Sequence, residues 1–304
     1  MRTHEQRVLN AVQRPGAYEE VVLDSHGLPV VLSVWAAATP RSPAVLFVPG
    51  TMTHPLFYED FLDALSRDGL TVVGLHPPAH GKSPRVRRPL TFEALVRGGQ
   101  TALAWMRVRF PGAPLVVLGS SQGGVVAMSL AVREPGLAAV FAHNVLDPTL
   151  PESVLITRAP AWAVRFHGSV DRLLQVTARL APRLPVPYWA YLDLDRVSRD
   201  PEVVERVTTD PLGRRTYPLG LVAGMLAEDV TRPVSCPVTV LASSGDPLFP
   251  LPYIRAVFER IDAPAKELVV IEAACHLLLV EAVDSVLPEL LPRLHAVTPS
   301  AEAR

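Results

Sequence analysis

The chain alternates between short uninterrupted apolar runs and longer segments in which apolar side chains recur every three or four positions. Runs typical of buried β-strands occupy residues 44–48, 70–75, 114–118, 137–145, 238–242 and 267–271. A helix is predicted where Phe57, Phe61 and Leu65 follow one another at four-residue spacing before Gly69. This alternation predicts an α/β fold with right-handed crossovers, in which helices cover both faces of a mostly parallel sheet.

Two additional strands are predicted before this alternation begins. Residues 18–23 and 28–36 read as strands that flank Asp24-Ser25-His26-Gly27, which predicts a tight hairpin. The preceding residues, 1–17, are polar and are interpreted as an N-terminal arm.

The alternation stops after residue 147 and resumes at residue 233. The intervening segment is helical in pattern and rich in aromatic residues and proline. We therefore predict a core made of 18–147 and 233–297, an inserted helical cap at 148–232, and a tail at 298–304. One apolar stripe of the cap consists of Val170, Leu173, Leu174, Thr177 and Leu180. Such a stripe serves either to bind a lipophilic substrate or to pack the cap onto the core.

The composition limits the kinds of molecule that this protein is expected to bind. The 304 residues are 49% hydrophobic and 19% charged, with a net charge of -1, so nothing indicates a nucleic-acid-binding surface. The start has no signal-peptide pattern, and no apolar run reaches the roughly 18 residues that a membrane helix needs. We therefore expect a soluble cytoplasmic protein without stable membrane insertion. The sequence is compatible with a homo-oligomer but does not predict one.

A serine flanked by glycines follows the predicted strand at 114–118. Gly119 and Gly123 stand two residues before and after Ser121, and a buried helix follows. This strand, turn and helix pattern is typical of a nucleophile elbow, in which a serine occupies a strained turn. Ser120 does not fit the spacing, and neither a Walker loop nor a dinucleotide loop is present.

Two more polar residues follow later strands. Asp246 and His276 come after the strands at 238–242 and 267–271, which gives the chain order Ser, Asp, His of an α/β-hydrolase triad. The carboxyl ends of parallel strands meet at one edge of a sheet, so these side chains are expected to lie together. Asp147 also follows a strand and is a rival acid, but the later position of Asp246 favours Asp246.

These motifs, with Pro49-Gly50-Thr51 and His80-Gly81-Lys82-Ser83, resemble those of the α/β-hydrolase fold, in particular the monoacylglycerol lipase and lysophospholipase-like group. The resemblance implies that Ser121 is the nucleophile, His276 the general base and Asp246 the residue that orients the imidazole. It also implies an oxyanion hole formed by the backbone amides of Gln122 and Thr51, with Met52 as the neighbouring alternative to Thr51.

The sequence thus predicts a serine hydrolase that cleaves a carboxylic ester, with a lipophilic acyl group, through an acyl-enzyme. A peptidase, thioesterase or carbon–carbon bond hydrolase with the same triad remains open, as does a ligand-binding protein of the same fold. No cofactor is expected. His76 and His80 have metal-ligand spacing, but no further ligand accompanies them, so no metal is expected.

Overall fold

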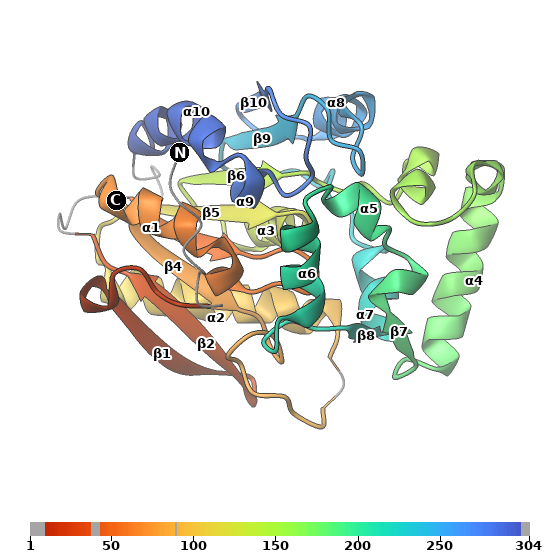
Figure 1. The fold of residues 1–304 in the computed structure, drawn as a ribbon, viewed down its shortest axis with the longest axis horizontal. Coiled ribbons are helices and arrows are strands. Elements are labelled where there is room, and N and C mark those ends of the chain that lie inside the picture. Colours follow the sequence, from red (N-terminus) through yellow and green to blue (C-terminus); the bar gives the residue numbers. More distant parts are fainter. Residues whose placement is uncertain (1–9, 38–42, 89, 299–304) are drawn as a thin grey trace.

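The computed structural model describes residues 10–37, 43–88 and 90–298, and its centre is an eight-stranded sheet (Figure 1). The strand order is β1-β2-β4-β3-β5-β6-β9-β10. Within this eight-stranded sheet, the β1–β2 and β2–β4 pairs are antiparallel and the other pairs are parallel. The strands are β1 Tyr18–Ser25, β2 Leu28–Trp35, β3 Ala44–Val48, β4 Thr71–His76, β5 Leu115–Ser120, β6 Ala139–His143, β9 Val238–Ser243 and β10 Lys266–Ile271. The predicted fold class, a mostly parallel sheet in an α/β-hydrolase fold, is confirmed.

The hairpin between β1 and β2 is tighter than predicted. Ser25 pairs with Leu28, so only His26 and Gly27 form the turn. Both have positive φ, 54° and 79°, as a two-residue hairpin turn of type I′ requires.

Helices cover the sheet on both sides (Figure 1). Helix α1 (Glu59–Arg67) contacts α10 (Val283–His295), and α2 (Phe92–Arg109) contacts α3 (Gln122–Arg133). Helix α8 (Leu251–Arg260) packs against β9. Thr91 caps α2, as its side chain accepts a hydrogen bond from the Ala94 amide. The terminal helical segment is divided at Ala282 into α9 (Leu278–Glu281) and α10.

The segment between β6 and β9 contains short helices and a small two-stranded sheet, which Figure 1 shows beside one end of the main sheet. Its elements are η3 Pro151–Ile156, η4 Ala161–Phe166, α4 His167–Leu180, β7 Pro185–Pro187, η5 Tyr188–Ala190, α5 Leu194–Val197, α6 Pro201–Thr209, β8 Thr216–Pro218 and α7 Leu219–Met225. We call residues 148–232 the cap. None of the helices within the described residues is long and apolar enough to cross a membrane.

Much of the apolar surface of the cap faces outward. In the predicted stripe on α4, Leu173 is 69% and Leu180 is 83% exposed. Trp162, Phe166 and Trp189 are also more than half exposed. Leu174, by contrast, packs beside Ala178, Leu219 and Ala223 in a small cluster. Only a minor part of the stripe therefore holds the cap together.

Candidate active site

Ser121 occupies a sharp turn between β5 and α3, with φ 54° and ψ −116°. A Cβ added to Gly119 would lie 2.0 Å from the Gly123 carbonyl oxygen, and one added to Gly123 would lie 2.1 Å from the carbonyl oxygen of Val48. Any side chain at either position would collide with backbone, which explains the glycine spacing. The turn is also held by the Ser121 amide, which donates to the carbonyl of His143 over 2.7 Å. A non-glycine residue with positive φ in such a turn is typical of a functional site.

Asp246 and His276 lie in contact at the ends of neighbouring strands. Nδ1 of His276 is 3.0 Å from Oδ2 of Asp246. The other carboxylate oxygen accepts hydrogen bonds from the amides of Leu248 and Phe249, so the turn after β9 fixes the carboxylate. The Phe249 ring stacks on His276 with 5.3 Å between centroids. Both hydrogen-bond contacts that His276 makes with described residues, to Asp246 and to Asn144, use Nδ1, so none of these residues occupies its Nε2.

The electrostatics of this pair favour an ionised carboxylate. Burial raises the pKa of Asp246, but the charge and hydrogen bond of His276 and the Phe249 amide outweigh it, so the pKa lies below its usual value. An ionised Asp246 accepts the Nδ1 proton of His276 and leaves Nε2 as the basic nitrogen.

Asn144, which directly follows β6, was not anticipated from the sequence. Its Nδ2 lies 2.7 Å from Oδ2 of Asp246 and 2.7 Å from Nε2 of His143. Only the amide nitrogen, not the amide oxygen, is compatible with an adjacent carboxylate. His143 also contacts Ser120, whose Oγ lies 3.1 Å from Nδ1. Ser120 pairs with His143 across the parallel strands, so the residues that follow them, Ser121 and Asn144, lie at the same edge of the sheet. A polar residue at the end of an apolar strand is therefore the signal that could have revealed Asn144.

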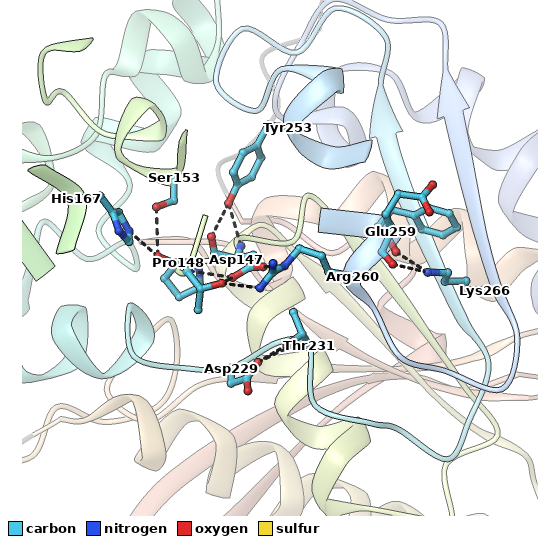
Figure 2. Close-up of polar contacts among 12 residues, drawn as sticks. Asp147, Pro148, Ser153, His167, Asp229, Thr231, Tyr253, Glu259, Arg260 and Lys266 are labelled. Carbon is cyan, nitrogen blue, oxygen red and sulfur yellow. Dashed lines mark hydrogen bonds and ion pairs between the residues drawn. The ribbon is translucent and has the colours of Figure 1, made fainter. Parts of the chain in front are cut away.

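Asp147, the rival acid, has other partners (Figure 2). Its Oδ2 pairs with Nε of Arg260 at 2.8 Å, and its Oδ1 accepts hydrogen bonds from the amide and hydroxyl of Thr149. The hydroxyl of Tyr253 is 2.9 Å from both the amide nitrogen and the carbonyl oxygen of Asp147. Asp147 therefore anchors the start of the cap to α8, whereas Asp246 contacts His276.

The loop after β3 forms a β-turn at Gly50–Thr53. The Thr53 amide donates to the Gly50 carbonyl at 3.3 Å, and Met52 has φ 68°. Positive φ at the third residue is the mark of a type II turn. The buried Tyr58 hydroxyl accepts from the Gly50 amide, so a side chain supports the loop after Pro49.

The backbone amides near Ser121 differ in their partners. The Met52 amide donates to the hydroxyl of Tyr217 at 2.8 Å, so it is not free to bind an oxyanion. Within the described residues, the amides of Thr51 and Gln122 have no acceptor. Gln122 begins α3, where the first amides lack intrahelical partners and the helix dipole favours negative charge. The oxyanion roles of Thr51 and Gln122 stay predictions, and the Met52 alternative is disfavoured because its amide already has an acceptor.

The histidines with metal-ligand spacing have hydrogen-bond partners on both nitrogens. Nε2 of His76 contacts the Ser33 hydroxyl, and its Nδ1 accepts from the Lys82 amide. His80 donates from Nδ1 to the Pro78 carbonyl, and its Nε2 lies 2.8 Å from the Tyr217 hydroxyl. Both side chains therefore organise the loop after β4.

Comparison with known proteins agrees with this architecture. A monoacylglycerol lipase of Mycolicibacterium smegmatis is 27% identical over 246 residues, which cover 77% of this chain and 81% of that protein. Human monoglyceride lipase is 27% identical over 263 residues, covering 83% and 82%. These relatives confirm the resemblance to the monoacylglycerol lipase group.

Solved structures share the fold at lower identity. A soluble variant of monoglyceride lipase from Saccharomyces cerevisiae has a TM-score of 0.73 at 16% identity, covering 93% of this chain and 97% of that one. The monoacylglycerol lipase of Paleococcus ferrophilus has a TM-score of 0.69 at 21% identity, covering 88% and 98%. Residues 39–283 match a family model described as serine aminopeptidase, S33. This chain belongs to that family of α/β-hydrolases.

Proposed function

We propose that this protein hydrolyses a lipophilic carboxylic ester, of the monoacylglycerol type, through an acyl-enzyme on Ser121. Ester hydrolysis by a serine enzyme is the activity that family membership and the lipase relatives support. The observation that carries the assignment to particular residues is the strained elbow at Ser121, at the same sheet edge as the Asp246–His276 pair.

In the proposed first half-reaction, Oγ of Ser121 attacks the ester carbonyl while Nε2 of His276 takes its proton. Asp246 accepts the Nδ1 proton and stabilises the imidazolium. The amides of Thr51 and Gln122 donate to the oxyanion of the tetrahedral intermediate. Collapse breaks the bond to the alcohol, which leaves with the proton from His276.

In the second half-reaction, His276 removes a proton from water, and the resulting hydroxide attacks the acyl carbonyl of the Ser121 ester. A second tetrahedral intermediate forms on the same amides. Its collapse returns the proton to Ser121 and releases the carboxylic acid.

A lipophilic substrate is supported by the apolar character of the cap, where large side chains such as Leu173 and Trp189 are exposed. The relatives named for monoacylglycerol hydrolysis support the same class. The peptidase alternative rests on the family description alone. We also propose that the protein is cytoplasmic, which cell fractionation tests. Light scattering tests whether it forms a homo-oligomer.

A substrate panel tests the proposal. Purified protein should release fatty acid from monoacylglycerols of graded chain length and should not cleave aminoacyl p-nitroanilides. Ser121→Ala should lose the ester activity. Faster cleavage of the p-nitroanilides than of every ester would favour the peptidase instead.

A further inference from the structure

The cap residues 210–217 cross over the turn that carries the predicted oxyanion amide. Both backbone polar groups of Met52 bind this segment: its amide donates to the Tyr217 hydroxyl at 2.8 Å, and its carbonyl accepts from the Arg214 amide at 3.0 Å. The Arg214 guanidinium also donates to the carbonyl of Ala79 in the loop after β4. A turn of the core is thus held by residues about 160 positions later in the chain.

The hydrogen atoms in this contact can be assigned uniquely. His80 must donate from Nδ1, because the Pro78 carbonyl can only accept. Burial lowers the pKa of His80 to about 3, so the imidazole is neutral and its Nε2 is an acceptor. The Tyr217 hydroxyl therefore donates to Nε2 of His80, and its oxygen lone pairs accept the amide of Met52.

Tyr217 also reaches the second predicted oxyanion residue. The Gln122 side chain is near enough to the Tyr217 hydroxyl to lower its pKa, against the larger upward effect of burial. Tyr217 itself is 2% exposed, and burial raises its pKa to about 12, so the hydroxyl keeps its proton at neutral pH. One cap side chain thus binds the residue after Thr51 and lies near the residue after Ser121.

The turn needs such support because Met52 has φ 68°. The third position of a type II turn favours glycine or asparagine, whereas a type I turn accepts most residues there. Rotation of the Thr51–Met52 peptide would convert one turn into the other and relieve the strain on Met52. The hydrogen bond from the Met52 amide to Tyr217 opposes that rotation, because this amide belongs to the rotating peptide.

We propose that Tyr217 is a positioning residue of the oxyanion hole: by binding the Met52 amide it holds the Thr51–Met52 peptide in its type II orientation and so fixes the Gly50–Thr53 turn from which the Thr51 amide reaches the reacting carbonyl. This inference rests on the proposed function. It also gives the His80 loop a role, because His80 fixes the Tyr217 hydroxyl in the orientation that accepts from Met52.

Tyr217→Phe removes the hydroxyl and keeps the ring. Loss of an oxyanion-hole donor lowers kcat by roughly 100-fold or more. Tyr217→Phe keeps the Thr51 amide but holds it less firmly, so its kcat should fall by less, about tenfold. KM should stay within about twofold, because the substrate carbonyl in the ground state gains little from these amides. Tyr191→Phe is the matched control: Tyr191 lies in the cap near Tyr217, and within the described residues its hydroxyl has no hydrogen-bond partner.

A transition-state analogue separates positioning from general damage. An alkyl trifluoromethyl ketone forms an oxyanion on Ser121, so its affinity for Tyr217→Phe should fall by the same factor as kcat/KM. The affinity for a non-reactive alkyl alcohol should not change. Glycine tolerates positive φ, so the loss caused by Tyr217→Phe should shrink when Met52→Gly is also present.

The inference is overturned if Tyr217→Phe folds and keeps wild-type kcat and wild-type affinity for the ketone, even where its melting temperature is lower. It is also overturned if the ketone and the alcohol lose affinity equally. Failure of the proposed function would appear differently, as absence of ester turnover in the wild type itself. Where Met52→Gly does not fold, the ketone-to-alcohol ratio for Tyr217→Phe decides alone.

Discussion

The side-chain amide of Asn144 donates to the carboxylate of Asp246 over 2.7 Å and also lies 3.3 Å from Nδ1 of His276. Asn144 itself has φ 58°, a conformation that asparagine adopts more readily than most residues. It therefore combines two tasks, turning the chain after β6 and holding the proposed acid in place.

Asn144→Ala should lower kcat by about tenfold, because Asp246 loses one of the hydrogen bonds that orient it toward His276. The unfolding free energy should fall by about 1–3 kcal/mol, since a buried polar group loses its partner. Steady-state kinetics and urea unfolding measure the two effects. Ser129→Ala removes a buried hydroxyl from α3 that contacts Glu228 and should leave kcat unchanged. Equal kcat in Asn144→Ala and wild type would refute the supporting role.

Substitutions of the two candidate acids, Asp246 and Asp147, should have different effects on kcat and on stability. Asp246→Asn should reduce kcat by roughly 10⁴-fold, because the amide cannot hold the imidazole in the required tautomer. Asp147→Asn should mainly reduce stability, because it breaks the ion pair with Arg260. The kcat of the folded variant should stay within a few-fold of wild type. The pair of variants is compared in the same ester assay, and a larger kcat loss in Asp147→Asn would reverse the assignment.

The glycine after the elbow should be sterically essential. Gly123→Ala places a Cβ 2.1 Å from the carbonyl oxygen of Val48, so we expect destabilisation of at least about 1–3 kcal/mol and loss of turnover. Gly136→Ala is the matched control, because a Cβ there meets nothing within 4 Å. Its unfolding free energy should stay within about 0.5 kcal/mol of wild type. Thermal melts of both variants test this, and similar melting temperatures would contradict the steric account.

Buried neutral histidines should make the protein less stable in mild acid. Burial lowers the pKa of both His80 and His143 from 6.5 to about 3. Between these values the unfolded chain binds more protons than the folded chain, so stability falls as the pH falls through this window. Each histidine contributes a slope of at most about 1.4 kcal/mol per pH unit.

Urea unfolding between pH 7.5 and pH 5 measures this slope. His143→Asn should flatten it, whereas His26→Asn, at an exposed turn position, should not. A slope unchanged by His143→Asn would show that the stability loss in acid has another origin.

The sequence predicted those features that depend on local patterns. The elbow at Ser121 could be recognised because its glycines are required by contacts within a few residues, and Asp246 and His276 because chain order places them at strand ends. The parallel strands of the main sheet were predicted to within a few residues because each is a mostly apolar run. The inserted segment was predicted because the alternation stops between residues 147 and 233, and the structure shows that it contains two short strands as well as helices.

Other features depend on contacts between distant residues. Asn144 lies beside Asp246 only because β6 and β9 are neighbours in the sheet, and no local pattern marks the pairing. Tyr217 reaches Met52 only because the cap folds back over the core. The apolar stripe of α4 correctly predicted a helix, but a helical period does not reveal whether its apolar side is covered.

Covalent labelling tests the central claim, nucleophilic attack by Ser121, most directly. A fluorophosphonate should add one adduct per chain, and peptide mass spectrometry should locate it on Ser121. Ser121→Ala should not be labelled, whereas Ser120→Ala, altered at the adjacent buried hydroxyl, should still be labelled. Labelling that persists in folded Ser121→Ala, or its absence from folded wild-type protein, would contradict the account.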